Sequence, residues 1–285
     1  DTLLMSSATI KLFLVHGDAK RLRTAELSNW SGKAVAGPRT EFDSILARDE
    51  AASVGVYFLT GVDPDSGKAA VYIGEAEIIR DRLKNHLAKD FWNHVVFFVS
   101  KDETLTEAHI KYLEGRLIEQ AKAAGRVVVT NGQASGAKLP ESDREDMEIF
   151  LARIHQLMPV LGADALVPIN VAPQGAGQAP ILFCEIKGLK ATGRQTPSGF
   201  VVLKASQAVL KERASAHQWP YTLVARQRLI EDGTLIAKAD HYVFTRDAEF
   251  SSPSAAATVI HGGSANGLLA WKDPAGHTLK DLEAV

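Results

Sequence analysis

The sequence predicts an α+β protein with two folded units. Its 285 residues are comfortable for two domains, and short β-rich runs alternate with segments of helical apolar spacing. Residues 168–180 are rich in Pro, Gly, Ala and Gln and have no apolar period, which is typical of an interdomain linker. We therefore place the boundary between the two units in this stretch.

The chain before residue 53 is predicted to be an N-terminal extension, residues 1–52, built from a strand, a loop and a helix. Alternating apolar residues predict the strand at 9–15, and the polar composition of 27–33 predicts the loop. Apolar residues that share one helical face predict the helix at 39–52.

Two β-rich runs, 55–59 and 70–74, flank a turn-rich segment and predict a β-hairpin. A symmetric closure of that turn would place Tyr57 directly opposite Tyr72. Both phenols would then lie on one face of the sheet, because successive side chains of a strand alternate between faces. Tyrosines also pair across strands for packing alone, and that is their more common role.

Further elements follow in the same part of the chain. Helical spacing at 78–87 and a β-branched, aromatic run at 95–99 predict a helix and a third strand. The segment 104–107 matches a capping box, so a long helix is predicted from there to Gly125, and another helix at 142–157.

The remaining chain divides into residues 132–180, a helix and the linker, and residues 181–285, a second α+β domain. The predicted elements of this domain are strands at 181–186 and 199–203, helices at 206–216 and 221–231, and a short helix after Ser252-Pro253.

Three charged side chains in the first unit suggest chemistry. Arg82 and His86, four residues apart, share a helix face and can act on one phosphate, although such a pair is usually only a solvated surface. Glu114 lies beside an apolar stripe of its helix, where a carboxylate needs a partner such as a metal ion or an arginine.

The order of these residues resembles the GIY-YIG nuclease family. The resemblance covers residues 53–131 and is carried by Gly55-Val56-Tyr57, Tyr72-Ile73-Gly74, Arg82, His86 and Glu114, with GVY in place of the first triplet. It implies a small three-stranded antiparallel sheet flanked by helices. It also implies metal-dependent hydrolysis of phosphodiester bonds.

The resemblance implies a role for each catalytic candidate. Glu114 would hold a single divalent metal, Mg²⁺ or Mn²⁺, and Tyr57 would activate the attacking water or relay its proton. Arg82 would stabilise charge on the phosphate, Tyr72 would position water or phosphate, and His86 would assist proton transfer.

Five residues are predicted to contact the substrate: Gly74, Asn131, Lys187, Lys190 and Arg194. The last three lie in a segment where basic residues outnumber acidic ones, which predicts either a positive patch or a plain solvated surface. Many relatives place a lysine directly after the second triplet, whereas this chain has Glu75, so the phosphate contact of that lysine is in doubt.

Residues 250–256, 264–267 and 271–273 make the C-terminal part similar to an uncharacterised domain found on some nucleases and methyltransferases. That association implies a role in the choice of targets.

The formal net charge of −2 means that binding of a polyanion needs a local cluster of Lys and Arg. Cys184 is the only cysteine, which excludes an internal disulfide and a multi-cysteine zinc site and favours a reducing, cytoplasmic location. We expect no signal peptide or transmembrane helix, because no apolar run is long enough.

These observations favour a metal-dependent endonuclease that acts on DNA. One alternative is a protein that binds nucleic acid without cutting it, and another is a nuclease for RNA or for branched or damaged DNA. The sequence does not indicate an oligomeric state.

Overall fold

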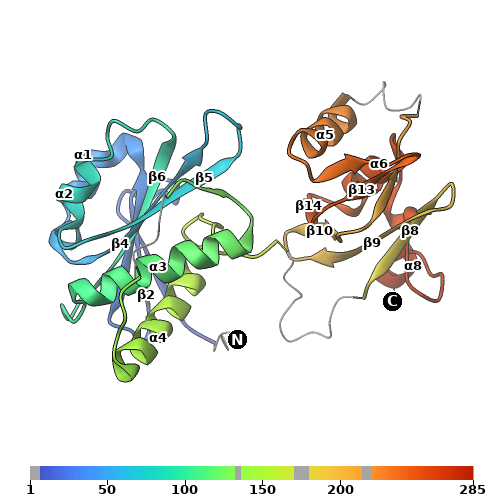
Figure 1. The fold of residues 1–285 in the computed structure, drawn as a ribbon. Helices are drawn as coiled ribbons and strands as arrows, with labels where there is room; N and C mark the ends of the chain where they lie inside the picture. The colour runs from blue at the N-terminus through green and yellow to red at the C-terminus, as the bar shows by residue number, and fades with distance from the viewer. Residues whose placement is uncertain (1–6, 132–135, 170–179, 214–219, 285) are drawn as a thin grey trace. The chain divides into compact units, whose positions relative to one another are not determined.

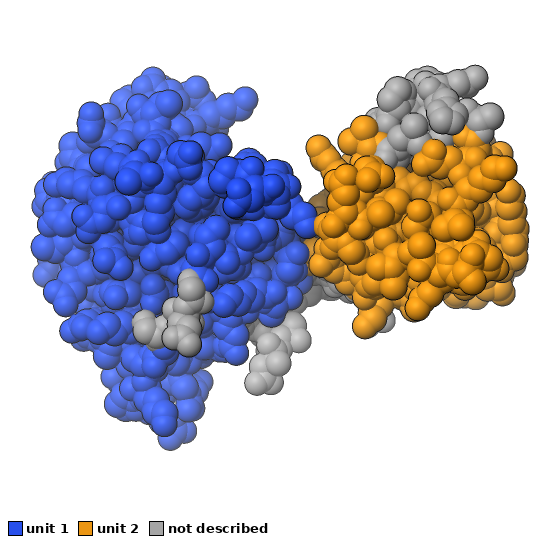
Figure 2. Space-filling model, turned by 45° about the horizontal axis from the view of Figure 1, so that its top comes forward, with its two compact units in different colours: residues 1–168 blue, residues 169–285 orange. Residues whose placement is uncertain are grey.

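The chain folds into two compact units, residues 1–168 and 169–285 (Figure 2). The computed structural model describes residues 7–131, 136–169, 180–213 and 220–284. The division falls where the predicted linker begins, and residues 170–179 of that linker lie outside the described residues. Each unit combines sheets and helices, so the α+β class predicted from the sequence is confirmed.

A seven-stranded sheet forms the centre of the first unit, in the order β1-β2-β3-β6-β4-β5-β7 (Figure 1). All neighbouring strands are antiparallel except β5 and β7, which are parallel. The strands are β1 (Ile10–Leu14), β2 (Arg23–Leu27), β3 (Gly32–Pro38), β4 (Gly55–Val62), β5 (Ala69–Ala76), β6 (Trp92–Ser100) and β7 (Val128–Val129).

The predicted three-stranded sheet is too small. The strands β6, β4 and β5 do form antiparallel neighbours, but β1, β2 and β3 from the predicted N-terminal extension continue the same sheet. The expected loop at 27–33 is instead the tip of the β2–β3 hairpin and the start of β3. These two strands were not predicted because only Leu27 and Val35 among their buried residues are large and apolar, and because Glu26 pairs with Lys33 across them.

Helices cover both faces of this sheet (Figure 1). On one face, α3 (Glu107–Ala124) packs beside α4 (Glu141–Leu157) over buried Val56 and Phe58. On the other face, α1 (Phe42–Leu46) and α2 (Ile79–Lys84) pack over Tyr57 and Leu59. Tyr57 and Tyr72 therefore belong to the face that α2 covers.

The single helix predicted at 39–52 is wrong, since three short helical segments stand there. They are the 3-10 turn η1 (Arg39–Glu41), α1, and the 3-10 turn η2 (Asp49–Ala52). The break lies at Arg48, whose backbone is extended with ψ 145° and whose guanidinium binds Glu50 at two points.

The long helix α3 begins two residues later than the predicted capping box. Thr106 caps it, accepting a hydrogen bond from the backbone of His109, whose side chain in turn accepts from the backbone of Thr106. Gly125 ends the helix in the left-handed conformation at φ 66°, as the sequence predicts.

The hairpin of β4 and β5 is present, but its register differs from the prediction by two residues. Tyr57 lies opposite Gly74 and Leu59 opposite Tyr72. The turn is centred one residue later than assumed, and it closes with hydrogen bonds from Asp63 N to Lys68 O and from Gly67 N to Asp63 O, both 2.8 Å. A shift of two keeps the phenols on one face as diagonal neighbours.

The second unit contains a five-stranded sheet, β14-β10-β9-β8-β15, and a three-stranded sheet, β11-β13-β12. The strands are β8 (Leu182–Ile186), β9 (Leu189–Thr196), β10 (Gly199–Val202), β11 (Gln207–Val209), β12 (Leu235–Ala237), β13 (His241–Phe244), β14 (Ala248–Phe250) and β15 (Trp271–Lys272). The helices are α5 (Pro220–Glu231), α6 (Pro253–His261), α7 (Gly267–Ala270) and α8 (Leu279–Glu283).

Two helix predictions for this unit have opposite outcomes. Ser252 caps α6 through its side chain and Gly262 ends it at φ 61°, as the sequence predicts. The helix predicted at 206–216 is wrong over the described residues, because β11 lies there and pairs with β13, which buries Ala208 and Val209. Residues 214–216 of that prediction lie outside the described residues.

Among the described residues, no helix is both long enough and apolar enough to cross a membrane.

Candidate active site

A cluster of aromatic and basic side chains lies on the α2 face of the first unit. Tyr57 comes from β4, Tyr72 from β5, and Arg82 and His86 from α2 and the turn that follows it. The Tyr57 hydroxyl is 2.7 Å from His86 Nε2. The Tyr72 ring stacks near Tyr57, with centroids 6.2 Å apart, and lies 4.7 Å from the imidazole of His86. The structure thus brings together four of the predicted catalytic residues.

Gly74 makes room for this arrangement. A Cβ atom at position 74 would lie 2.3 Å from the Tyr57 hydroxyl oxygen and 2.4 Å from the adjacent ring carbon. The phenol therefore crosses the neighbouring strand where that strand has no side chain. Gly74 has a steric role in the site, and its predicted contact with substrate stays a prediction.

Tyr57 is fully buried, and its proton is hard to remove. Burial, followed by the neighbouring Tyr72 and Glu114, raises the pKa of the Tyr57 phenol well above its ordinary value, while Arg82 acts in the opposite direction. The positive charge of Arg82 lies near enough to the phenol to favour its ionised form, and the pKa of Arg82 is raised in return. In the resting site Tyr57 is a neutral phenol beside a cationic arginine.

His86 is buried and neutral. Burial lowers its pKa to about 4, with the positive charges of Lys89 and Arg82 adding to the effect. Because Arg82 can only donate, we assign the phenol proton of Tyr57 to the bond with His86 Nε2, which leaves the imidazole proton on Nδ1. Nδ1 has no hydrogen-bond partner among the residues that the structure describes. A buried polar atom left in this state costs about 1–3 kcal/mol.

Glu114 lies on α3, the helix that covers the opposite face of the sheet. Its side chain is half-buried, and its negative charge contributes to the raised pKa of Tyr57. The helix packs against β5, and β7 pairs with β5 only at Ala70 and Val71. The link between Glu114 and the phenol is this charge effect, the smallest of the named causes of the raised pKa of Tyr57.

A hard divalent cation fits this donor set. Mg²⁺ is commonly held by one or two carboxylates and completes its shell with water and substrate phosphate oxygens. Within the described ranges, no group of three or more His, Cys, Asp or Glu side chains could hold a metal ion. The resemblance implies Glu114 as the single protein carboxylate ligand of such an ion, and this stays a prediction.

Asn131 fixes the strand that carries Tyr72 and Gly74. Its Oδ1 accepts a hydrogen bond of 2.9 Å from the Ile73 backbone N–H, and its Nδ2 donates one of 2.5 Å to the Ile73 carbonyl. The side chain takes the place of a partner strand at Ile73. The structure gives Asn131 a positioning role, and its predicted contact with substrate stays a prediction.

Two residues of the cluster were missed by the sequence analysis. The Lys89 ammonium lies 4.0 Å from the centroid of the Tyr72 ring. The Arg39 guanidinium binds the segment that carries Lys89, through the carbonyls of Lys89 and Leu87 at 2.6 and 2.7 Å. Neither residue is spaced from the motif residues by a helical or strand period, so the sequence pattern did not indicate them. The one indirect signal was the lack of a lysine after the second triplet, which leaves room for a cation from elsewhere in the chain.

The remaining predicted substrate contacts are Lys187, Lys190 and Arg194. All three belong to the second unit, Lys187 in the β8–β9 turn at φ 49° and the other two in β9. Lys190 forms an exposed ion pair of 3.1 Å with Glu185. Lys187 and Lys190 are exposed, whereas Arg194 is partly buried.

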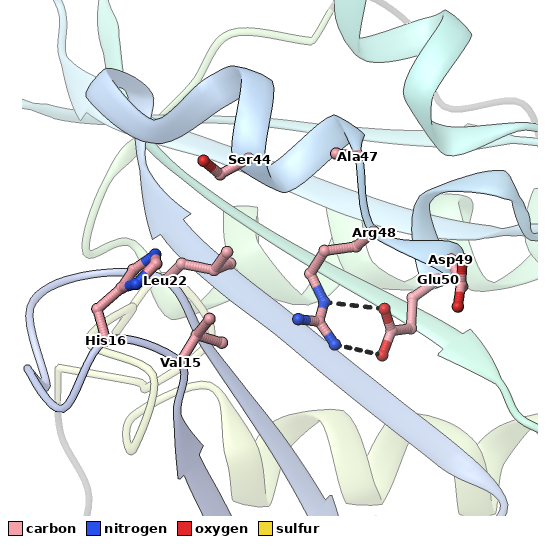
Figure 3. Close-up of a pocket in the computed structure, with 8 residues that line it drawn as sticks. All are labelled: Val15, His16, Leu22, Ser44, Ala47, Arg48, Asp49 and Glu50. Carbon is pink, nitrogen blue, oxygen red and sulfur yellow. Dashed lines mark hydrogen bonds and ion pairs between the residues drawn. The ribbon is translucent and has the colours of Figure 1, made fainter.

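Two surface hollows lie elsewhere in the first unit. One has a volume of about 420 Å³ and holds the Arg48–Glu50 ion pair, with His16 and Leu22 on the side across from it (Figure 3). The other, about 660 Å³, is lined in part by Lys33 and Glu50. Neither hollow is lined by Tyr57, and the exposed residues of the aromatic cluster include the cations Arg82 and Lys89.

Cys184 does not provide a reactive thiol. It is fully buried in β8, with its Sγ 3.3 Å from His261 Nε2, and burial raises its pKa to about 12. The thiolate that a nucleophilic role needs is not formed near neutral pH.

Comparison with known proteins identifies one family. Residues 182–283 match a family described as a domain of unknown function, DUF4357. The uncharacterised C-terminal domain predicted from the sequence is thereby supported. No match to the GIY-YIG family was found, so the resemblance of residues 53–131 stays a prediction. No curated protein and no solved structure matches the chain.

Proposed function

We propose that the first unit is a metal-dependent endonuclease that hydrolyses phosphodiester bonds in DNA. The observation that carries the proposal is the buried hydrogen bond between Tyr57 and His86, placed beside a cation, Arg82, and near a carboxylate, Glu114. Hydrolysis of a phosphodiester needs a route for the proton of water, positive charge on the phosphate and a stabilised leaving group. In the cluster, Tyr57 and His86 provide the proton route and Arg82 provides the positive charge. Glu114 provides a ligand for a metal ion that would stabilise the leaving group.

The proton route runs through Tyr57 to His86. The phenol oxygen accepts a proton from the attacking water as the phenol gives its own proton to His86 Nε2. This concerted relay avoids a free phenolate, which burial of Tyr57 makes unfavourable. It also requires neutral His86, and the lowered pKa of His86 keeps that form present at pH 7.

Charge on the phosphate is stabilised from the exposed side of the cluster. Arg82 is exposed, and its guanidinium can donate to a nonbridging phosphate oxygen. Mg²⁺ or Mn²⁺ held by Glu114 would neutralise charge on the phosphate and on the leaving oxygen and would lower the pKa of coordinated water. Oxygen from water forms the new bond to phosphorus, the bond to the leaving oxygen breaks, and solvent protonates that oxygen.

The second unit is proposed to select targets. Its match to DUF4357 covers nearly all of its length and carries no stated activity. Lys187 and Lys190 lie exposed on β9 and the turn before it, where they can contact phosphates independently of sequence, and Arg194 follows on the same strand.

The test is cleavage of supercoiled plasmid, linear duplex, single-stranded DNA and RNA in Mg²⁺ or Mn²⁺. Glu114→Gln is expected to abolish cleavage, and Arg82→Ala is expected to slow it at least ~10²-fold, as for other preorganised charge-stabilising groups. Glu119→Gln is the matched control, because Glu119 lies on the same helix, is 68% exposed and pairs only with Arg116 among the interactions described. Near-normal cutting by the first two variants would contradict the proposal.

Binding without cleavage is the second candidate function. The complete burial of Tyr57 favours it, because a phenol that water cannot reach in the resting state is also typical of simple packing. Preference for RNA or for branched or damaged DNA changes the substrate and not the chemistry. The substrate panel above separates these possibilities.

A further inference from the structure

Lys89 lies on the exposed surface of the aromatic cluster. Its ammonium is 4.0 Å from the centre of the Tyr72 ring, within the range of a cation–π interaction. Lys89 is an exposed residue, so a ligand in solvent can approach it. Lys89 therefore sits next to a residue that the proposed function assigns to the substrate.

A second cation, Arg82, is close to Lys89. Burial, followed by the positive charge of Arg82, lowers the pKa of Lys89, so the two like charges repel each other. Among the residues that the structure describes, no carboxylate forms an ion pair with Lys89. A bound polyanion would remove this repulsion, whereas an apolar or cationic ligand would not.

The segment that carries Lys89 is held in place by several contacts. Arg39 donates to the carbonyls of Leu87, Lys89 and Trp92, and its guanidinium stacks 4.4 Å from the Trp92 ring centroid. The Trp92 indole donates a 3.0 Å hydrogen bond to the carbonyl of His86. The backbone of the segment is thus fixed at both ends, so the place of Lys89 beside Tyr72 follows from the fold.

We propose that Lys89 binds a backbone phosphate of the nucleic-acid substrate, next to Arg82, and supplies the cation that Glu75 does not provide after the second triplet. The proposal rests on the proposed function for its substrate class. It does not depend on cleavage, because phosphate binding can be measured with no metal present.

The test is the affinity for a labelled duplex and a labelled single strand in EDTA, measured by fluorescence anisotropy between low and moderate salt. Lys89→Gln is expected to weaken binding roughly tenfold near 0.1 M salt and to reduce the slope of log K against log salt by about one. Lys89→Arg keeps the charge and is expected to bind like the wild type.

Lys84→Gln is the matched control. Lys84 lies on α2, is 54% exposed and pairs with Asp81 at 3.3 Å, so its removal is expected to leave the slope unchanged. A slope that is equal in the wild type and in Lys89→Gln would overturn the proposal, as would a wild type that binds none of the probes. A wild type that binds with a Lys89-dependent slope but never cuts would support the phosphate contact and contradict the nuclease function.

Discussion

His86 is the residue whose charge state decides the proposed chemistry. It accepts the Tyr57 proton at Nε2 only when it is neutral, and its imidazole lies in a buried site with two cations nearby. These surroundings lower its pKa because they penalise the charged form. A histidine on a solvated helix face, the common alternative for an Arg/His pair, would instead be partly protonated near pH 6.5.

The pH dependence of cleavage tests this state. His86 has a pKa of about 4, so the neutral base is present above that pH and lost below it. Titration of His86 is therefore expected to leave kcat/KM almost unchanged between pH 8 and pH 5. Below pH 4, kcat/KM is expected to fall about tenfold per pH unit.

His86→Gln is expected to lower kcat by roughly 10²–10⁴-fold, the usual contribution of a general base. His16→Gln is the control, since His16 lies in the separate hollow beside Leu22. A break in the profile near pH 6.5 would show that His86 is exposed to solvent and would contradict the buried pair.

Individual site residues differ in whether the sequence alone can predict them. Tyr57, Tyr72, Arg82 and His86 were predicted to act together, and the structure brings them together because strand alternation and helical spacing are local rules. Lys89 could not be predicted in the same way, because its place depends on Arg39, which lies fifty residues earlier in the chain.

At the scale of elements, the β4–β5 hairpin orders the site. The sequence predicts both strands, but it does not define the centre of the turn, and the register was therefore wrong by two residues. The predicted face of each side chain was nevertheless correct, because side chains on a strand alternate with a period of two residues. The β2–β3 hairpin was missed because alanines and a cross-strand Glu–Lys pair give little apolar contrast.

Gly74→Ala tests how the hairpin supports the site. The added Cβ would meet the Tyr57 phenol, so the ring must move away from His86. We expect a loss of stability of about 1–3 kcal/mol in urea denaturation, typical of overpacking, together with reduced cleavage.

Gly136→Ala is the matched control, because a Cβ there meets nothing within 4 Å and should change stability by a few tenths of a kcal/mol. Equal stability of the two variants would mean that the tyrosine does not cross the strand at Gly74.

At the scale of the whole molecule, the chain combines a candidate catalytic unit with a unit that matches DUF4357. The linker composition predicted this division, because a segment without apolar period cannot add to either core. The extent of the first sheet could not be predicted, since pairing between β3 and β6 joins segments that are distant in the sequence. The central claim concerns the first unit alone, namely that the buried phenol takes part in cutting nucleic acid.

The most direct test of that claim compares plasmid cleavage by the wild type, Tyr57→Phe and Tyr112→Phe in Mg²⁺ or Mn²⁺. Tyr112 is the matched control, because its hydroxyl also donates a hydrogen bond, to Glu148 at 2.6 Å, but lies on α3 outside the cluster. The relay predicts that Tyr57→Phe loses at least ~10²-fold in rate while Tyr112→Phe cuts like the wild type. Cutting by Tyr57→Phe at the wild-type rate would contradict the account.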